Sequence, residues 1–325
     1  MGRSIYHIQP FAAAHIEDAA RLLADAYAGE QLGSPHLPAI QRLGNGRGIG
    51  VFEDALRATV PAVGVAALHG GKLCGFMVET MRFSWKGQQV AQCDELSHAA
   101  RTEDHGLLYS LLYQELARRW VEDGRHLHII GHLAHDAVLK ESLYRLGFGA
   151  LLAEELRDLS PAAGAADVDV LEDPDPALLV DLQREHRGYY RTSPIFLRKD
   201  ESDDQILSEL QEHLASGDKL LACTGEDGFD ALFIVGESAA DAEGRLLRQT
   251  NSAQVKSAYV RPSVRGRGVG TALLQRSIAW ARQHGCDRLF VEHETANIPG
   301  SAFWAKYFEP YLLISMRYVD NTLPG

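Results

Sequence analysis

The chain has 325 residues, of which 46% are hydrophobic and 23% charged, with a net charge of −12 at pH 7. These values are ordinary for a globular protein of about two domains. The acidic balance argues against a nucleic-acid partner, which needs a basic surface, and no apolar run is long enough to span a bilayer. The four cysteines lack the spacing of a metal or redox motif, so we expect a reduced, cytoplasmic protein.

The first half of the chain alternates helical and strand patterns. Residues Ala12–Ala26 carry apolar side chains at helical spacing, and a Gly70-Gly71 turn joins two strand candidates, Val63–His69 and Lys72–Thr80. Residues 107–136 combine an amphipathic helix, a glycine stop and a short apolar strand, and a last strand is expected over Ala150–Leu159.

The second half repeats this order at an offset of 162, which pairs Leu111 with Leu273 and Gly124 with Cys286. Between the halves, residues 160–166 are small and uncharged, as in a linker. We therefore expect two tandem α+β domains, 1–160 and 166–325, each with a mixed, mostly antiparallel sheet flanked by helices. The second-half elements are expected at Ala177–His186, Asp203–Leu214, Lys219–Thr224, Phe229–Val235, 269–284, Arg288–Val291 and Leu312–Val319.

The most informative segment is a glycine-rich turn between a strand ending at Val260 and a helix. The first N–H groups of a helix lack intrahelical partners and favour an anion, and glycines let the backbone approach it. Three arginines within seven residues add positive charge, at 261, 265 and 267. A flexible surface turn is the alternative. A dinucleotide site is disfavoured because the spacing is not G-x-G-x-x-G. The anion-binding residues are expected to be Arg265, Gly266, Arg267, Gly268, Val269, Gly270 and Thr271.

The pattern Val260-x-Pro262-x-x-Arg265-Gly266-x-Gly268-x-Gly270, followed by an amphipathic helix, resembles the acetyl-CoA signature of the GCN5-related N-acetyltransferase (GNAT) superfamily. The resemblance covers residues 166–325, and residues 1–160 resemble the same fold in a degraded form. It implies a tandem GNAT-like protein with acetyl-CoA as co-substrate. Its pantetheine arm would lie between two splayed strands near Tyr259 and Val260, and its pyrophosphate would lie on the N–H groups of 266–271. Asn297 falls where the superfamily has an asparagine that contacts the cofactor or orders the site, although a loop asparagine is the simpler alternative.

The resemblance also suggests catalytic residues. In the branch that acetylates ribosomal proteins, a glutamate five residues before the asparagine serves as general base, and Glu292 has that spacing. Strand alternation places Glu292 and Glu294 on one face, where each would raise the pKa of the other. The usual acid, a tyrosine seven residues after the asparagine, is replaced by Trp304, and Tyr307 would substitute only if the local helix were rotated or shortened.

The first half lacks these features. Its turn, Arg101–Gly106, is shorter and contains Glu103 and Asp104, which would repel a pyrophosphate. At the repeat offset, Ile130 and His135 stand where the second half has Glu292 and Asn297. We expect an inactive domain that is structural or shapes the substrate site. Histidines at 126, 128, 132 and 135 are candidate metal ligands, but strand alternation explains them equally well.

The resemblance implies an N-acetyltransferase that acts on the primary amine of a small molecule or peptide. Tyr189, Tyr190 and Phe196 are candidates for the acceptor pocket, although core packing is a common fate of aromatic residues. A non-catalytic acyl-CoA-binding sensor is the alternative, favoured by Trp304. Aminoacyl transfer from tRNA is disfavoured by the acidic surface.

Overall fold

A computed structural model describes residues 5–43, 46–59, 62–226, 228–238, 244–248 and 251–323. The chain forms two compact units. Unit 1 comprises Met1–Glu154, Glu243–Thr250 and Pro310–Gly325, and unit 2 comprises Glu155–Ala242 and Asn251–Glu309. Both units contain β-sheet strands and flanking helices, so the predicted α+β class is confirmed.

Unit 1 contains two runs of paired strands, in the orders β1-β2-β3-β6 and β4-β5-β7-β14-β8. Helix α3 buries one apolar face, with Leu108, Leu112, Leu116 and Trp120, in the core of this unit. Its elements are β1 (His7–Pro10), α1 (Ile16–Gly33), α2 (Gly50–Thr59), β2 (Gly64–His69), β3 (Lys72–Val78), β4 (Met81–Trp85), β5 (Gln88–Cys93), β6 (His98–Ala100), α3 (His105–Glu122), β7 (Leu127–Leu133), α4 (Ala137–Arg145), β8 (Gly149–Arg157), α7 (Arg245–Arg248) and β14 (Glu309–Tyr318), with 3-10 turns at Ala13–His15 and Ile40–Arg42.

Unit 2 contains the strand order β13-β12-β11-β10-β9, in which β12 and β13 are parallel and the other neighbours antiparallel. Its elements are β9 (Val170–Glu172), α5 (Val180–Tyr190), α6 (Asp203–Ala215), β10 (Lys219–Gly225), β11 (Gly228–Glu237), β12 (Ser252–Val260), α8 (Val269–Gln283), β13 (Arg288–Glu294) and α9 (Ile298–Trp304), with 3-10 turns at Pro176–Leu179 and Pro262–Val264.

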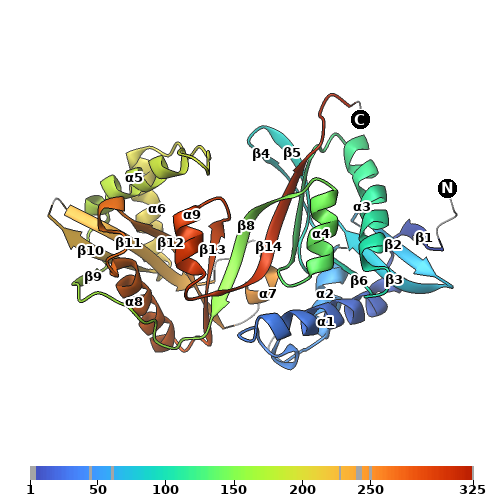
Figure 1. Ribbon diagram of the computed structural model, residues 1–325, viewed down its shortest axis with the longest axis horizontal. Helices are drawn as coiled ribbons and strands as arrows, with labels where there is room; N and C mark the ends of the chain where they lie inside the picture. The colour runs from blue at the N-terminus through green and yellow to red at the C-terminus, as the bar shows by residue number, and fades with distance from the viewer. Residues whose placement is uncertain are drawn as a thin grey trace. The chain divides into compact units, whose positions relative to one another are not determined.

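The two faces of the unit 2 sheet carry separate cores because successive strand residues point to opposite sides. Leu221 and Phe233 pack with α8, whereas Leu220 and Leu232 pack with α5 and α6. Figure 1 shows α5 and α6 on one side of these strands and α8 on the other. The sheet is therefore covered on both faces, and β12 and β13 separate beyond Val255 and Val291.

The units differ from the expected ranges 1–160 and 166–325. The division falls after Glu154, and the last strand packs in unit 1, where β14 pairs antiparallel with β7 through Leu312 and Leu133. A local pattern predicts a strand but not the strand it pairs with. Helix α2 and the hairpin of β4 and β5 were not predicted, because their segments are short and rich in polar residues.

The repeat offset of 162 was wrong by one residue in the structure. Strand β7 begins at Leu127 and β13 at Arg288, an offset of 161. Gly124 and Gly285, with φ of 72° and 69°, end the two preceding helices at the same offset. Apolar positions on a helix recur at three and four residues, so a slip of one residue still pairs many of them. Gly131 and Asp136, rather than Ile130 and His135, therefore correspond to Glu292 and Asn297.

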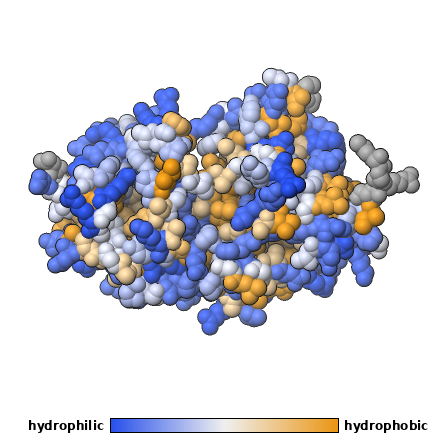
Figure 2. Space-filling view, viewed as in Figure 1, coloured by the Kyte–Doolittle hydropathy of each residue, from blue (hydrophilic) through white to orange (hydrophobic). Residues whose placement is uncertain are grey.

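None of the helices within the described ranges is both long and apolar enough to cross a bilayer. On the face drawn in Figure 2, hydrophobic residues form small patches separated by hydrophilic ones.

Candidate functional site

The glycine-rich turn lies between the 3-10 turn Pro262–Val264 and α8. Gly266 and Gly268 have φ of 75° and 83°, in the left-handed region that favours glycine. Gly268 caps α8, and its carbonyl accepts the hydrogen bond from the N–H of Ala272 at 3.0 Å. The N–H groups of residues 269–271 precede this first helical bond, so the helix itself gives them no acceptor. They are available to an anion.

A cavity of about 400 Å³ lies beside this turn. Strand β12 pairs with β13 only as far as Val255 and Val291, but it stays paired with β11 as far as Val260. The edge of β12 from residue 256 to 260 is therefore free of β13, as expected for splayed strands. The predicted residues that line the cavity are Tyr259, Val260, Arg265, Gly266, Gly268, Gly270, Thr271, Asn297 and Tyr307.

Two predicted cofactor residues do not line this cavity. Arg267 is exposed at the turn, and Val269 packs against the core beneath α8. Successive residues at the start of a helix point their side chains in different directions around the axis. A contiguous motif therefore cannot place every side chain at the cavity. At the cavity, these two residues could offer a ligand only their backbone N–H groups and, for Arg267, a more distant positive charge.

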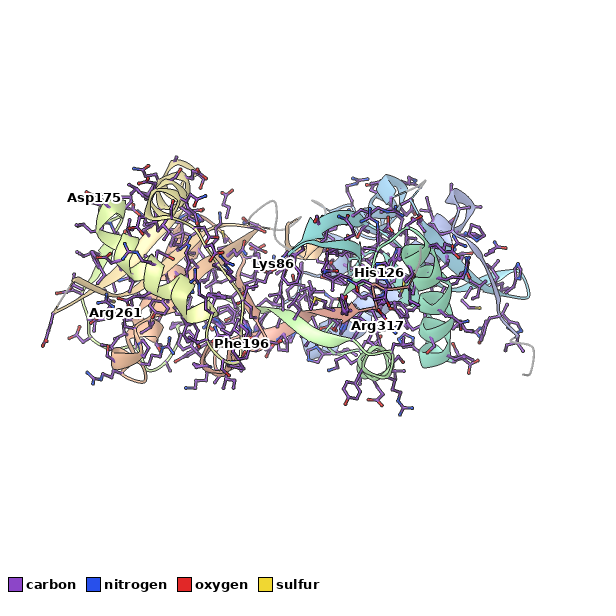
Figure 3. The ribbon with its side chains drawn as sticks, turned by 90° about the horizontal axis from the view of Figure 1, so that it is seen from above. Lys86, His126, Asp175, Phe196, Arg261 and Arg317 are labelled. Atoms are coloured by element: carbon purple, nitrogen blue, oxygen red, sulfur yellow. The ribbon has the colours of Figure 1, made fainter. Side chains whose placement is uncertain are left out.

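The arginines of the turn have distinct environments. Arg265 donates from Nε to the carbonyl of Val260 at 2.9 Å, and its guanidinium lies 5.0 Å from the ring centroid of Tyr189. Arg261, labelled in Figure 3, makes two hydrogen bonds to the carboxylate of Glu185, at 2.8 and 3.0 Å. Arg261 is thereby neutralised, and Arg265 is held beside the cavity by an aromatic ring and a backbone carbonyl.

Residues 161–166, which we call the strap, run across the start of α8. The segment that was predicted to be a linker is packed against the rest of unit 2. Ala162 is buried in the unit 2 core, Gly164 lines the cavity, and the N–H of Ala166 donates to the carbonyl of Gly268 at 3.2 Å. A Cβ on Gly268 would lie only 2.8 Å from the backbone of the strap. Gly268 is therefore required both by its φ and by the close approach of the strap.

A second, more polar hollow of about 200 Å³ adjoins the cavity. Both are lined by His186, Ala258, Asn297 and Trp304, so the two spaces meet there. Glu292 lines this second hollow, which we call the polar hollow. Glu292 thus lies beside the space that adjoins the cavity, not in the cavity itself.

Glu292 and Glu294 are both half-buried, and His293 between them is buried, as strand alternation predicts. Glu294 lines neither space. Its carboxylate instead faces the hydroxyl of Tyr190. Burial raises the pKa of Tyr190 well above its usual value, and the charge of Glu294 and a hydrogen bond to it add to the shift. Of the two carboxylates, Glu292 is the one placed to meet a ligand.

Tyr307 and Asn297 have structural partners. The Tyr307 hydroxyl lies 2.9 Å from Oγ1 of Thr271 and donates to the carbonyl of Ala163 at 3.1 Å. Asn297 caps α9, because its Oδ1 accepts the N–H of Gly300 at 3.2 Å, and it also accepts from the Tyr189 hydroxyl at 2.9 Å. Tyr307 is thus held at the start of α8, whereas Asn297 lies where the two spaces meet.

His186 is a site residue that sequence reasoning missed. Its ring stacks on Tyr259 with centroids 5.0 Å apart, and it lines both spaces. Burial, followed by the charges of Lys199, Arg187 and Arg265, lowers its pKa to about 3, so the imidazole is neutral at pH 7. The one available signal was its position a helical turn before Tyr189 and Tyr190. Phe196, labelled in Figure 3, is 73% exposed in the loop after α5 and lines neither space.

In the described part of unit 1, the positions that correspond to the cavity line two separate hollows. One, of about 510 Å³, lies at the start of α3 and is lined by residues that include Gly106, Ser110 and Val138. The other, of about 20 Å³, is lined by residues that include Glu95, His98 and Leu246. Asp136, which corresponds to Asn297, caps α4 and lies 2.7 Å from Nε2 of His105. At the start of α3, the carboxylate of Asp104 accepts from the hydroxyl of Tyr6 at 2.6 Å. No group of three or more metal-ligating side chains occurs within the described ranges, including the histidines at 126–135.

Comparisons with known proteins find similarity to one family over part of the chain. The model of the acetyltransferase (GNAT) family matches residues 181–308. A GCN5-related N-acetyltransferase from Sphaerobacter thermophilus is similar over 97% of this chain and 96% of its own, with 13% identity and a TM-score of 0.58. A GCN5-related glucosamine N-acetyltransferase region of a fungal multi-domain GH3 β-N-acetylglucosaminidase is similar over 96% of this chain and 38% of its own, with 15% identity and a TM-score of 0.50. The curated proteins gave no match.

Proposed function

We propose that this chain, a member of the GNAT superfamily through residues 181–308, transfers an acetyl group from acetyl-CoA to the primary amine of a small molecule or peptide. The observation that carries the proposal is the cavity in which the glycine turn, the free edge of β12 and the polar hollow meet. The first two suit the donor, and the third suits an acceptor.

The cavity offers the groups that acetyl-CoA requires. Its pyrophosphate would be held by the N–H groups of residues 266–271, where the dipole of α8 favours negative charge. Its pantetheine amides would pair with the backbone of β12 near Tyr259 and Val260, in the manner of an added strand. These residues all belong to unit 2, so we assign acyl donor binding to unit 2 and a structural or substrate-shaping role to unit 1.

Glu292 is the proposed general base. The acetyl group arrives as a thioester, which is already activated, so the chain has to position the amine and remove a proton. The amine nitrogen bonds to the acyl carbon, the carbon–sulfur bond breaks, and the coenzyme thiolate leaves. Glu292 takes the proton from nitrogen, directly or through water. Glu294 is the second candidate, but its contact with Tyr190 makes it less available.

Trp304 favours a second candidate function, a non-catalytic acyl-CoA sensor. Its indole stands where the superfamily has an acid tyrosine, and it lies 5% exposed where the two spaces meet. Tyr307 offers no replacement in this arrangement, because its hydroxyl donates to the carbonyl of Ala163. The thiolate of coenzyme A is a good leaving group, however, so the loss of an acid is compatible with catalysis.

Two measurements separate these functions. Calorimetric titration with acetyl-CoA should give binding that Gly266→Asp weakens by on the order of tenfold or more, because the carboxylate repels the pyrophosphate. Gly266→Ala is the matched control, since a Cβ there meets no atom within 4 Å. Equal affinities of the two variants would contradict the assigned site.

Release of free coenzyme A with a panel of amines is the second measurement. Glu292→Gln should lower kcat roughly 10²- to 10³-fold while leaving acetyl-CoA affinity unchanged. Binding of acetyl-CoA without turnover of any amine would favour the sensor.

A further inference from the structure

Three of the cationic side chains that line the polar hollow are Arg187, Lys256 and Lys199. Arg187 and Lys256 are paired with carboxylates. Arg187 hydrogen-bonds Gln183 Oε1 at 3.0 Å and forms ion pairs with Glu201 and Glu209. Lys256 bonds both carboxylate oxygens of Asp218, at 2.8 and 2.9 Å. The charges of Arg187 and Lys256 are thus compensated within the chain.

Lys199 differs from these two. Its ammonium lies 3.9 Å from the ring centroid of Tyr190, and it lines the polar hollow. Over the ranges that the structure describes, it forms no ion pair with a carboxylate. The neighbouring Asp200 is engaged by Arg191 at 2.6 Å and by Arg198.

The backbone around Lys199 is held in place. The guanidinium of Arg191 donates to the Lys199 carbonyl at 3.2 Å, and the N–H of Leu197 donates to the carbonyl of Tyr190 at 2.8 Å. Lys199 is therefore presented to the hollow by an anchored loop, with an aromatic ring on one side. A half-buried ammonium in this setting has lost part of its hydration and gains from an anionic partner.

Negative charge lies near the hydroxyl of the same Tyr190 ring. The hydroxyl of Tyr190 faces Glu294 and lies within electrostatic reach of Glu292, whereas Lys199 lies over the ring itself. The hollow is thus lined by Glu292, a carboxylate suited to an amine, and by Lys199, an ammonium suited to an anion. A ligand with both charges matches this pair.

Resting on the proposed function, we propose that the acceptor is a primary amine that also carries a carboxylate or another anionic group, and that Lys199 binds this group while the amine lies at Glu292. Lys199 is thereby a specificity-determining residue of the acceptor site. An ammonium acts as a point charge and accommodates either a carboxylate or a phosphate. The acidic net charge of the chain, −12, does not oppose the match, because the local cation selects the anion and the carboxylate selects the amine.

The test compares three acceptors built on one alkyl amine, which end in a carboxylate, a phosphonate or a neutral carboxamide. Steady-state release of coenzyme A is measured for the wild type, Lys199→Gln and Arg198→Gln. Arg198→Gln is the matched control, because it removes the same charge from the same loop but does not line the hollow. We expect Lys199→Gln to raise KM for an anionic acceptor on the order of tenfold, with kcat kept and the carboxamide unaffected. The preferred anion is the one whose KM responds more.

Three results would overturn this inference while leaving the proposed function intact. These are a carboxamide used as well as both anionic acceptors, a Lys199→Gln effect equal for all three acceptors, or an effect that Arg198→Gln reproduces. If no acceptor is turned over, calorimetric titration of each acceptor into the protein saturated with coenzyme A replaces the kinetics. Binding of an anionic acceptor that Lys199→Gln weakens would support Lys199 recognition without catalysis, and absence of binding would overturn it. Failure of acetyl-CoA to bind at all would instead contradict the proposed function.

Discussion

The contact between the strap and the glycine turn yields a prediction that two alanine substitutions can test. Gly266 and Gly268 have nearly the same left-handed backbone, with φ of 75° and 83°. A Cβ on Gly266 would meet nothing within 4 Å, whereas a Cβ on Gly268 would lie 2.8 Å from the nitrogen of Ala166 and 2.8 Å from the oxygen of Gly164. The two substitutions therefore cost the same backbone strain and differ in the strap alone.

The expected magnitudes follow from these contacts. Alanine in the left-handed backbone region is about 1–2 kcal/mol less favourable than glycine. This difference is the whole loss in the free energy of unfolding that we expect for Gly266→Ala. Gly268→Ala adds the displacement of the strap and with it the hydrogen bond from Ala166 to the Gly268 carbonyl, worth about 1 kcal/mol. The total loss expected for Gly268→Ala is therefore about 2–3 kcal/mol in the free energy of unfolding.

Urea unfolding and calorimetric titration with acetyl-CoA are the two assays. Gly266→Ala should retain affinity within a few fold, because its Cβ points into open space. Gly268→Ala should lose affinity on the order of tenfold, because the strap, through Gly164, forms part of the cavity wall. Equal losses of stability and affinity in the two variants would refute a role for the strap, since the backbone strain is common to both.

Two further predictions concern a tyrosine of unit 2 and a carboxyl group of unit 1. Tyr307→Phe removes the hydroxyl contacts with Thr271 and Ala163, so the free energy of unfolding should fall by about 1 kcal/mol. The kcat of this variant should stay within a few fold of the wild type. A hundredfold loss of kcat would instead identify Tyr307 as the general acid. Burial, together with the charge of Asp94, raises the pKa of Glu95 from 4.5 to about 7. The contribution of Glu95 to the free energy of unfolding is therefore complete at a pH below its unfolded-state pKa, and it is lost as the pH rises through 7. Between pH 5 and pH 8, the unfolding free energy of the wild type should fall relative to that of Glu95→Gln by about 2–3 kcal/mol, measured by urea unfolding at each pH; a constant difference would show that Glu95 stays ionised.

Features of the fold that depend on near neighbours in sequence were predictable. The hairpin at Gly70-Gly71 has both glycines at positive φ, as its turn requires, and its strands end within two residues of the expected positions. The pairing of β14 with β7 was not predictable, because it joins residues about 180 positions apart whose apolar patterns fit many partners. The repeat offset failed for a related reason, since helical faces tolerate a one-residue slip that strands do not.

The site also has residues that could be predicted from local sequence and residues that could not. The glycine turn and Glu292 belong to contiguous motifs, and the structure brings the turn to a cavity and Glu292 to the polar hollow beside it. His186, Lys199 and the strap reach these spaces only through the packing of α5, its following loop and the segment before β9. A lone histidine in a polar helix or a lysine in a loop has no distinguishing pattern in sequence. Their roles emerge from burial and from the partners they have or lack.

The packing of unit 1 bears on the proposal that the acyl donor binds in unit 2. Helix α7, which lies between β11 and β12 in sequence, packs in unit 1, where Leu246 and Leu247 are buried. The carboxylate of Glu95 accepts the N–H groups of Arg245 and Leu246 at 2.5 and 2.9 Å, and Arg245 pairs with Asp94 at 2.9 Å. Leu246 lines the small hollow that corresponds to one part of the unit 2 cavity, so an apolar side chain occupies volume that a pantetheine arm would need there. Burial of these leucines stabilises unit 1 by about 1.5–3 kcal/mol each, a gain that an open cavity would forgo. This packing fills the part of unit 1 where a pantetheine arm would lie, and it supports the proposal that the acyl donor binds in unit 2.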